Sequence, residues 1–243
     1  MAGFEQVTDH IYRMEVPFQV WGPIVVPVAL WLVSLGEGWT LIDSGPPEAA
    51  DELIAAVRQA TEGRGVQRVF LTHAHYDHAG GLAALRLAWN PAVVCHRDEA
   101  PFVTGEIGYR RQRPRGVAFW FGRWALRTLH SQIPVAREVE GGQAVDGMAV
   151  IHLPGHTPGQ VGLLHPQDGA IICGDAAMNL SDRLSPPFAI ATPDPGIALA
   201  SMVRLSELDY DHLLPSHGPP ILSRGREAVL DYLDRHGVTT ESV

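Results

Sequence analysis

The stretch from Thr72 to Gly81 reads THAHYDHAGG and concentrates side chains that can bind metal ions. Four of its positions offer such side chains, namely His73, His75, Asp77 and His78. Residues two apart in an extended segment project to the same side, so His73 and His75 can bind one ion. Asp77 and His78 follow the bend before a predicted helix, and we expect them to face a different centre. The stretch therefore favours two metal ions that share one loop over a polar loop without metal.

Three further candidate ligands occur later in the chain, each directly after an apolar segment that reads as a strand. They are His156 in LPGHTPGQ, Asp175 in IICGDA and His217 in LLPSHGPP. Glycine or proline bounds each of them, which is typical of a loop at the end of a strand. A single Asp in such a place would carry little weight. Together with HAHYDH, the three residues indicate a metal site built from several loops on a rigid sheet.

In combination these motifs resemble those of the metallo-β-lactamase superfamily of metallohydrolases. HAHYDH matches the HxHxDH signature of that family, and GHTPG, GD and SHG match its later ligand motifs in order. The resemblance covers nearly the whole chain, from IYRME to PSHGPP. It implies the α/β class and an αβ/βα four-layer sandwich of the metallo-β-lactamase type, with the site along one edge of the two sheets.

The resemblance also implies how the ligands are divided between two ions. One ion would be held by His73, His75 and His156, the other by Asp77, His78 and His217, and Asp175 would bridge the two ions. Asp43, in LIDSG, matches a family position whose side chain orients the metal ligands without binding metal itself. An ordinary Asp that caps its own turn is the alternative for Asp43.

Two divalent ions about 3.5–4 Å apart would supply hydrolytic chemistry. A water molecule that bridges them loses a proton near neutral pH, and the resulting hydroxide attacks a carbonyl or phosphoryl group that the ions polarise. Asp77 can both bind metal and accept a hydrogen bond from the nucleophile, so it is the predicted catalytic residue. Imidazole and carboxylate ligands without thiolate suit Zn²⁺, our default, with Fe and Mn as alternatives.

We expect a dinuclear hydrolase of a carboxylic ester, thioester or lactone, in the glyoxalase II and lactonase-like branch of the family. Two departures from branch patterns stand out. Acyl-homoserine lactonases carry a tyrosine where this sequence has Met178, and only 26 residues follow His217, too few for the helical glutathione-binding domain of longer glyoxalase II enzymes. The alternatives are a mono-iron persulfide dioxygenase-like enzyme, a promiscuous β-lactamase and a non-catalytic metal-binding protein.

Alternating runs of apolar strands and amphipathic helices fill the rest of the chain. We predict strands at residues 11–16, 26–35, 38–47, 66–72, 92–96, 148–156, 160–166, 169–176 and 212–218, and helices at residues 48–61, 79–88, 197–208 and 224–236. No linker or low-complexity run separates two halves. We therefore predict a single domain over residues 1–243.

An insertion rich in arginine and aromatic residues, at about residues 105–137, is the most individual part of the sequence. Between Ile107 and Arg137 there are seven arginines and no acidic residue, so this segment carries +7 and the remainder of the chain −16. The residues that a helix would place on an aromatic face and a cationic face are Arg115, Phe119, Trp120, Arg123 and Trp124. The aromatic residues could pack on the domain or form a homodimer contact; alternatively the segment is a substrate lid whose arginines attract anionic or acyl substrates.

The net charge of −9 argues against a protein that coats nucleic acid. No run of about 18 apolar residues is present, so we expect no membrane insertion. The first ten residues, MAGFEQVTDH, lack the cationic and apolar regions of a secretory signal, and the two cysteines, Cys95 and Cys173, form no CxxC pair and read as buried thiols. We therefore expect a cytoplasmic enzyme that acts on a small-molecule substrate.

Overall fold

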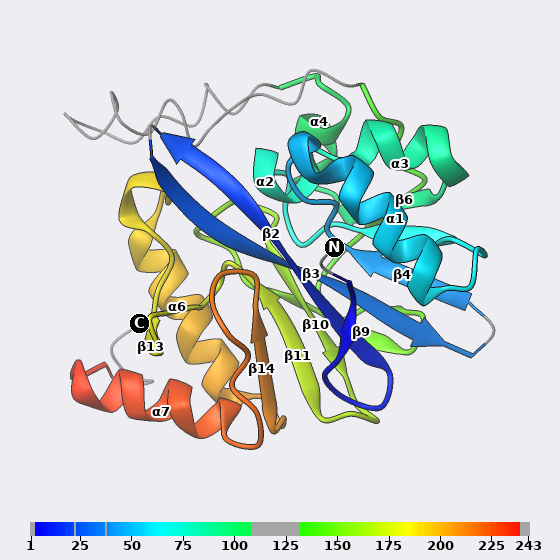
Figure 1. Cartoon of the computed structure of the whole chain (residues 1–243). Helices are drawn as coiled ribbons and strands as arrows, with labels where there is room; N and C mark the ends of the chain where they lie inside the picture. The colour runs from blue at the N-terminus through cyan, green and yellow to red at the C-terminus, as the bar shows by residue number, and fades with distance from the viewer. Residues whose placement is uncertain (1–2, 22, 37, 108–131, 239–243) are drawn as a thin grey trace. The chain divides into compact units, whose positions relative to one another are not determined.

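The computed structural model describes residues 3–21, 23–36, 38–107 and 132–238 (Figure 1). The chain divides into two compact units, residues 1–139 and residues 140–243. The single domain predicted from the sequence stays a prediction. Five predicted lid residues lie outside the described residues: Arg115, Phe119, Trp120, Arg123 and Trp124.

The first unit contains a seven-stranded sheet with the strand order β1-β2-β3-β4-β5-β6-β7. Its strands are β1 (Glu5–Gln6), β2 (Ile11–Trp21), β3 (Ile24–Leu35), β4 (Gly38–Ile42), β5 (Arg68–Phe70), β6 (Ala92–His96) and β7 (Arg137–Val139). The pairs from β1 to β4 are antiparallel, and those from β4 to β7 are parallel. Because parallel neighbours need a crossover, helices follow β4 and β5.

The helices that the structure describes in the first unit are short. They are η1 (Pro47–Ala49), α1 (Ala50–Ala60), α2 (Tyr76–Ala79), α3 (Leu82–Trp89) and α4 (Ala100–Val103). Figure 1 shows α1 and α3 side by side, and these two helices contact each other. Leu53 and Val57 of α1, four positions apart, join Leu82 and Leu85 of α3 in one buried core with residues of β2 to β6. The helices thus cover one face of the sheet and hold the loop between β5 and α3 against it.

The helix predicted at residues 79–88 differs from the one observed. A single turn, α2, ends at Ala79, and α3 begins only at Leu82. Gly80 and Gly81 separate the two, and they lie against the turn after β4, where the amide of Gly81 donates to the carbonyl of Gly45 at 2.9 Å. Close packing against this turn therefore interrupts the helix that the apolar pattern predicts.

The second unit contains a five-stranded sheet with the strand order β14-β11-β10-β9-β8 and a small hairpin. The sheet strands are β8 (Ala144–Val145), β9 (Met148–His152), β10 (Val161–His165), β11 (Ala170–Gly174) and β14 (His212–Pro215), and the hairpin strands are β12 (Met178–Leu180) and β13 (Arg183–Ser185). Among the strand pairs described in this unit, only β11–β14 is parallel.

Within its described residues, the second unit also contains two long helices and one short turn. They are η3 (Ala189–Ala191), α6 (Pro195–Glu207) and α7 (Gly225–Arg235). The carboxylate of Asp194 caps α6 by accepting from the amide of Ile197 at 3.0 Å, and Pro195 occupies the first turn. Buried residues of both helices, such as Met202 and Val229, share a core with β9, β11 and β14. The strand ends that precede His156, Asp175 and His217 are therefore anchored on a packed face.

Each predicted strand overlaps an observed one, although most differ at their ends, and the short strands β1, β7, β8, β12 and β13 were not predicted. The largest differences are at β2, which continues to Trp21 beyond the predicted end at residue 16, and at β4, which ends at Ile42 before the predicted end at residue 47. Pro17 lies in β2 and pairs with Pro27 of β3, so two prolines face each other in one ribbon. Among the helices that the structure describes, none is long and apolar enough to cross a membrane.

Candidate metal centre

Four predicted ligands of the first unit, His73, His75, Asp77 and His78, lie together and are called the N-terminal cluster. They follow β5 and continue into α2, and at most 8% of each residue is exposed. The imidazole rings pack closely, with ring centroids 4.6 Å apart for His73 and His75 and 4.0 Å apart for His73 and His78. The short extended segment before α2 thus gathers three imidazoles and a carboxylate in one buried place.

Asp43 supports this cluster from the end of β4. Its Oδ1 accepts from the amide of Thr72 at 2.8 Å, while its Oδ2 accepts from the hydroxyl of Thr72 at 2.8 Å and from Nδ1 of His78 at 2.8 Å. The residue is fully buried and has a φ of +61°, a conformation that is uncommon for residues other than glycine. The three bonds hold Asp43 in this conformation and tie β4 to the cluster.

The hydrogen bonds also assign the protons of two imidazoles. The hydroxyl of Thr72 donates to Asp43, so its oxygen accepts from Nδ1 of His73 at 3.1 Å. His78 likewise donates through Nδ1, in its case to Asp43. In the neutral ring the other nitrogen, Nε2, then carries the lone pair that a metal ion needs.

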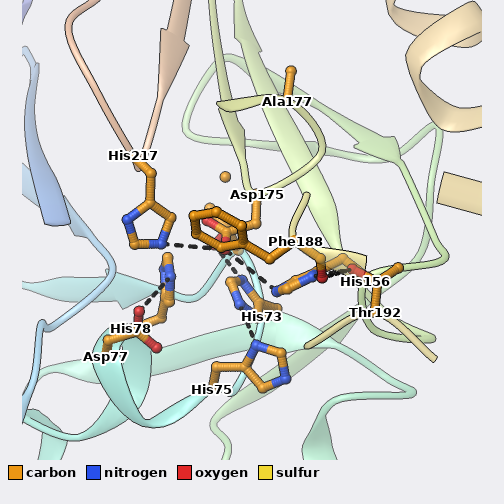
Figure 2. A network of polar contacts seen from close by, with 12 residues as sticks. His73, His75, Asp77, His78, His156, Asp175, Ala177, Phe188, Thr192 and His217 are labelled. Atoms are coloured by element: carbon orange, nitrogen blue, oxygen red, sulfur yellow. Dashed lines mark hydrogen bonds and ion pairs between the residues drawn. The ribbon is translucent and has the colours of Figure 1, made fainter. Parts of the chain in front are cut away.

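The remaining donor atoms of the N-terminal cluster face each other in two pairs (Figure 2). Nε2 of His73 lies 3.0 Å from Nδ1 of His75, and Nε2 of His78 lies 3.6 Å from Oδ2 of Asp77. Each pair offers two ligand atoms for one ion. The two pairs are His73/His75 and Asp77/His78, and the division of these ligands between two ions stays a prediction.

Glu99 contacts the backbone of the same loop and was not predicted from the sequence. Its side chain is fully buried, and Oε2 accepts from the amide of Ala74 at 2.8 Å. Ala74 stands between His73 and His75, so this bond fixes the peptide that separates two candidate ligands. Glu99 lies just before α4, and its distance in sequence from the ligand motifs gives no sign of a role at the site.

Gly81 allows the cluster to approach the turn after β4. A Cβ atom at this position would lie 2.2 Å from the carbonyl oxygen of Ser44. The same turn binds the cluster directly, because the amide of Ser44 donates to the carbonyl of His78 at 2.6 Å. The glycine pair at the end of THAHYDHAGG is therefore required for packing.

In the second unit, His156, Asp175 and His217 come together and are called the C-terminal cluster. His156 follows β9, Asp175 follows β11 and His217 follows β14, and at most 3% of each is exposed. Nε2 of His156 and Nε2 of His217 each lie 3.3 Å from the same oxygen, Oδ2 of Asp175. The dashed lines of Figure 2 show both imidazoles directed at this carboxylate. Three strand ends thus converge on one oxygen atom.

A second contact holds His156 from its other side. Nδ1 lies 3.1 Å from Oγ1 of Thr192, a residue that is 2% exposed and lies between η3 and α6. Gly155 gives α6 access to the His156 loop: it has a φ of +119°, and a Cβ atom there would lie 2.2 Å from the amide nitrogen of Ala198. Thr192 belongs to no motif, and the sequence carried no signal for it.

The chemistry of the two clusters fits divalent metal ions. Together they offer five imidazoles and two carboxylates, all buried, and no thiolate. Burial raises the pKa of Cys173 to about 12 and also raises the pKa of Cys95, so both remain protonated thiols at neutral pH. Both cysteines are free and buried, as predicted. Nitrogen and oxygen ligands of this kind suit Zn²⁺, Fe or Mn.

Comparison with known proteins places this geometry in a family. A model of the metallo-β-lactamase superfamily matches residues 23–217. The chain belongs to this superfamily. Both clusters fall within the matched residues, and the matched range runs from the β2–β3 turn to His217 itself.

Relatives within the metallo-β-lactamase superfamily cover most of the chain. The probable metallo-hydrolase YflN of Bacillus subtilis (strain 168) is 28% identical over 211 residues, which are 79% of this chain and 80% of that protein. An N-acyl homoserine lactonase of Bacillus thuringiensis is 24% identical over 210 residues, which are 75% of this chain and 76% of that protein.

A solved structure confirms the predicted fold class. TTHA1623, described in a di-iron-bound form, is 30% identical and has a TM-score of 0.65, with 87% of this chain and 96% of that chain covered. The α/β metallo-β-lactamase fold expected from HxHxDH and the later motifs is therefore correct. Family membership makes this chain a member of a group of metal-dependent hydrolases.

Proposed function

We propose that the protein is a dinuclear metal-dependent hydrolase whose two clusters form one centre. The observation that carries this proposal is the carboxylate of Asp175, with His156 and His217 each 3.3 Å from the same oxygen. When the proton of a neutral imidazole lies on Nδ1, the lone pair on Nε2 would repel that oxygen unless a cation lay between them. A carboxylate flanked in this way is suited to bridge two ions.

The number of ligands supports the joining of the clusters. A catalytic metal commonly has three protein ligands and an open position. The N-terminal cluster offers two donors to each of two ions, which leaves each ion one ligand short. The C-terminal cluster offers two imidazoles and a bridging carboxylate, which is the complement required. The proposed ions are thus held by His73, His75 and His156, and by Asp77, His78 and His217, with Asp175 shared.

When bound, the two ions would supply a bridging hydroxide near neutral pH and polarise the carbonyl that it attacks. The chain's own contribution is orientation. Asp43 and Thr72 hold the Nδ1 protons of His78 and His73, so that Nε2 of each ring faces the centre. Asp77, the most exposed member of the N-terminal cluster at 8%, is proposed to accept a hydrogen bond from the nucleophile.

We propose a carboxylic ester, thioester or lactone as the substrate, in the glyoxalase II and lactonase-like branch. Support comes from relatives that are described as metallo-hydrolases and as an N-acyl homoserine lactonase. Met178 is 1% exposed and offers no hydroxyl to polarise a carbonyl, so substrate binding differs from that of lactonases with a tyrosine there. Zinc remains the proposed metal, with Fe and Mn as alternatives.

The other expectations from the sequence remain proposals. They are a small-molecule substrate without a nucleic-acid partner, a cytoplasmic location, and either a substrate lid or a homodimer contact in the insertion at about residues 105–137.

Metal content and hydrolysis test the proposal together. Protein purified without added metal should hold two divalent ions per chain by elemental analysis and should hydrolyse part of a panel of esters, thioesters and lactones. His75→Ala and Asp175→Ala should each lower kcat/KM by at least about 10³-fold while circular dichroism shows a retained fold. His236→Ala is the matched control, because His236 is exposed at the end of α7 and should keep full activity.

Three outcomes would contradict this function. Full activity of metal-free protein or of either ligand variant would refute the dinuclear mechanism. One iron per chain with oxygen consumption on a persulfide would replace the hydrolase with a dioxygenase. Bound metal without turnover on the whole panel would favour a non-catalytic metal-binding protein.

A further inference from the structure

Thr192 contacts a candidate ligand through the only polar group of its side chain. Its Oγ1 lies 3.1 Å from Nδ1 of His156 and 2.8 Å from the carbonyl oxygen of Phe188. Thr192 and His156 are each 2% exposed, so the contact between them is shielded from water. Figure 2 shows Thr192 beside His156, on the side of the ring opposite to Asp175.

The chemistry of the groups sets the direction of both hydrogen bonds. A carbonyl oxygen can only accept, so the hydroxyl proton of Thr192 must go to Phe188. The hydroxyl has no second proton, and its oxygen therefore accepts from His156. His156 must then carry hydrogen on Nδ1. In the neutral ring Nε2, 3.3 Å from Asp175, is left with its lone pair.

Thr192 is held firmly enough to impose this choice. The amide of Thr192 donates to Ala189 at 3.3 Å, and the amide of Asp194 donates to the carbonyl of Gly155, the residue before His156, at 3.3 Å. The segment between η3 and α6 is therefore bound to the His156 loop at two points, the backbone of Gly155 and the ring of His156. Thr72 makes the equivalent contact with His73 in the first unit.

We propose that Thr192 is a positioning residue that fixes the tautomer and ring orientation of His156, so that Nε2 is presented as a metal ligand. The role lies outside the GHTPG motif and is carried by a residue 36 positions away. Its effect on metal binding rests on the proposed function, whereas its effect on the tautomer is a property of the metal-free protein. Groups that orient a metal-binding histidine through its second nitrogen typically alter metal affinity 10–100-fold.

The tautomer can be read directly by NMR. In protein with ¹⁵N-labelled histidine and no metal, long-range ¹H–¹⁵N correlations distinguish a proton on Nδ1 from one on Nε2. The spectrum is recorded well above the ordinary imidazole pKa of about 6.5, at a pH where the ring carries one proton. Wild-type His156 should show the proton on Nδ1. A proton on Nε2 would overturn the proposal, whatever any variant does.

Three variants distinguish the effect of the Thr192 hydroxyl from the effect of the size and shape of its side chain. Thr192→Val keeps the shape and removes the acceptor, so the Nε2–H form of His156 should appear. Thr192→Ser keeps the hydroxyl and should retain the Nδ1–H form. Thr157→Val is the matched control: Thr157 is fully buried beside His156, and its Oγ1 has no hydrogen-bond partner among the described residues. An unchanged tautomer in Thr192→Val, or an equal change in Thr157→Val, would refute the role of Thr192.

Metal affinity provides the second readout. Competition with a chromophoric zinc chelator should show binding weakened about 10–100-fold in Thr192→Val and restored in Thr192→Ser. Unchanged zinc affinity in a Thr192→Val protein whose tautomer has shifted would overturn the link to metal binding. If wild-type protein bound no zinc, the proposed function would fail, while the tautomer measurement would still decide the role of Thr192.

Discussion

Asp43 accepts a hydrogen bond from Nδ1 of His78 at 2.8 Å, although the two residues are 35 positions apart and both are fully buried. The same carboxylate accepts two bonds from Thr72. All three donors point at Asp43, so its side chain must be acceptor-only. This single residue therefore couples the end of β4 to the loop that carries the N-terminal cluster.

We predict that Asp43→Asn is destabilising despite its equal size. Its amide group would direct N–H hydrogens at a donor of either Thr72 or His78, leaving that donor unsatisfied in a buried place. The free energy of unfolding should fall by about 1–3 kcal/mol in urea titrations, and zinc affinity should fall about 10–100-fold. Asp51→Asn, on an exposed position of α1, is the control and should change neither quantity.

Gly81→Ala should also destabilise the protein, through steric overlap. The added Cβ would lie 2.2 Å from the carbonyl oxygen of Ser44, so α2 or the turn after β4 must move. We expect a loss of about 1–3 kcal/mol or more, measured as a lower midpoint of unfolding. Gly196→Ala is matched in chemistry but exposed in α6, where the new Cβ meets its nearest atom at 3.4 Å. That variant should be neutral or stabilising by up to about 1 kcal/mol, and an equal loss in both variants would contradict the steric explanation.

Part of this site could be predicted from the sequence because its residues stand at the ends of apolar strands. His156, Asp175 and His217 are single polar residues that follow apolar strands and have Gly or Pro beside them. The change from an apolar run to a polar residue can be recognised from the sequence alone. Thr192 and Glu99 have no such contrast. Their roles arise when the chain folds back over 36 and 25 positions to meet His156 and Ala74.

Backbone conformation was equally hidden from the sequence. Asp43 has a φ of +61° where three hydrogen bonds converge on its side chain, and its partners Thr72 and His78 are distant in the sequence. Near the break between α2 and α3, the carbonyl oxygen of Ser44 lies 2.2 Å from where a Cβ of Gly81 would be. Local periodicity predicts which segments are helical or extended, but contacts between distant segments decide where each one stops.

Alkaline pH should destabilise the protein with an onset near pH 9. Burial raises the pKa of Cys173 from 9.0 to about 12, and it also raises the pKa of Cys95 and of Tyr210. Above pH 9 the unfolded chain loses thiol protons that the folded chain keeps, so the unfolded state gains relative stability. Urea midpoints of the metal-loaded protein should be constant up to about pH 8.5 and fall steadily towards pH 12.

The variant Tyr210→Phe isolates the contribution of Tyr210 to this pH dependence from that of the two cysteines. Tyr210 is 4% exposed, and its hydroxyl has no hydrogen-bond partner among the residues that the structure describes. Its removal should be neutral or stabilising by up to about 1 kcal/mol near pH 8, and it should make the decline above pH 10 shallower. An unchanged alkaline slope in this variant would show that Tyr210 does not contribute.

Glu99 should matter for the loop of the N-terminal cluster rather than for the fold as a whole. Its Oε2 accepts from the amide of Ala74, which lies between His73 and His75. Glu99→Ala removes that acceptor, so hydrogen exchange at the Ala74 amide should speed up by about tenfold or more, as expected for a lost bond of about 1.4 kcal/mol. Glu99→Gln keeps an acceptor oxygen of the same reach and should preserve most of the protection. If Ala74 exchanged equally slowly in Glu99→Ala and in the wild type, another group would have to hold this peptide, and Glu99 would have no part in placing His73 and His75.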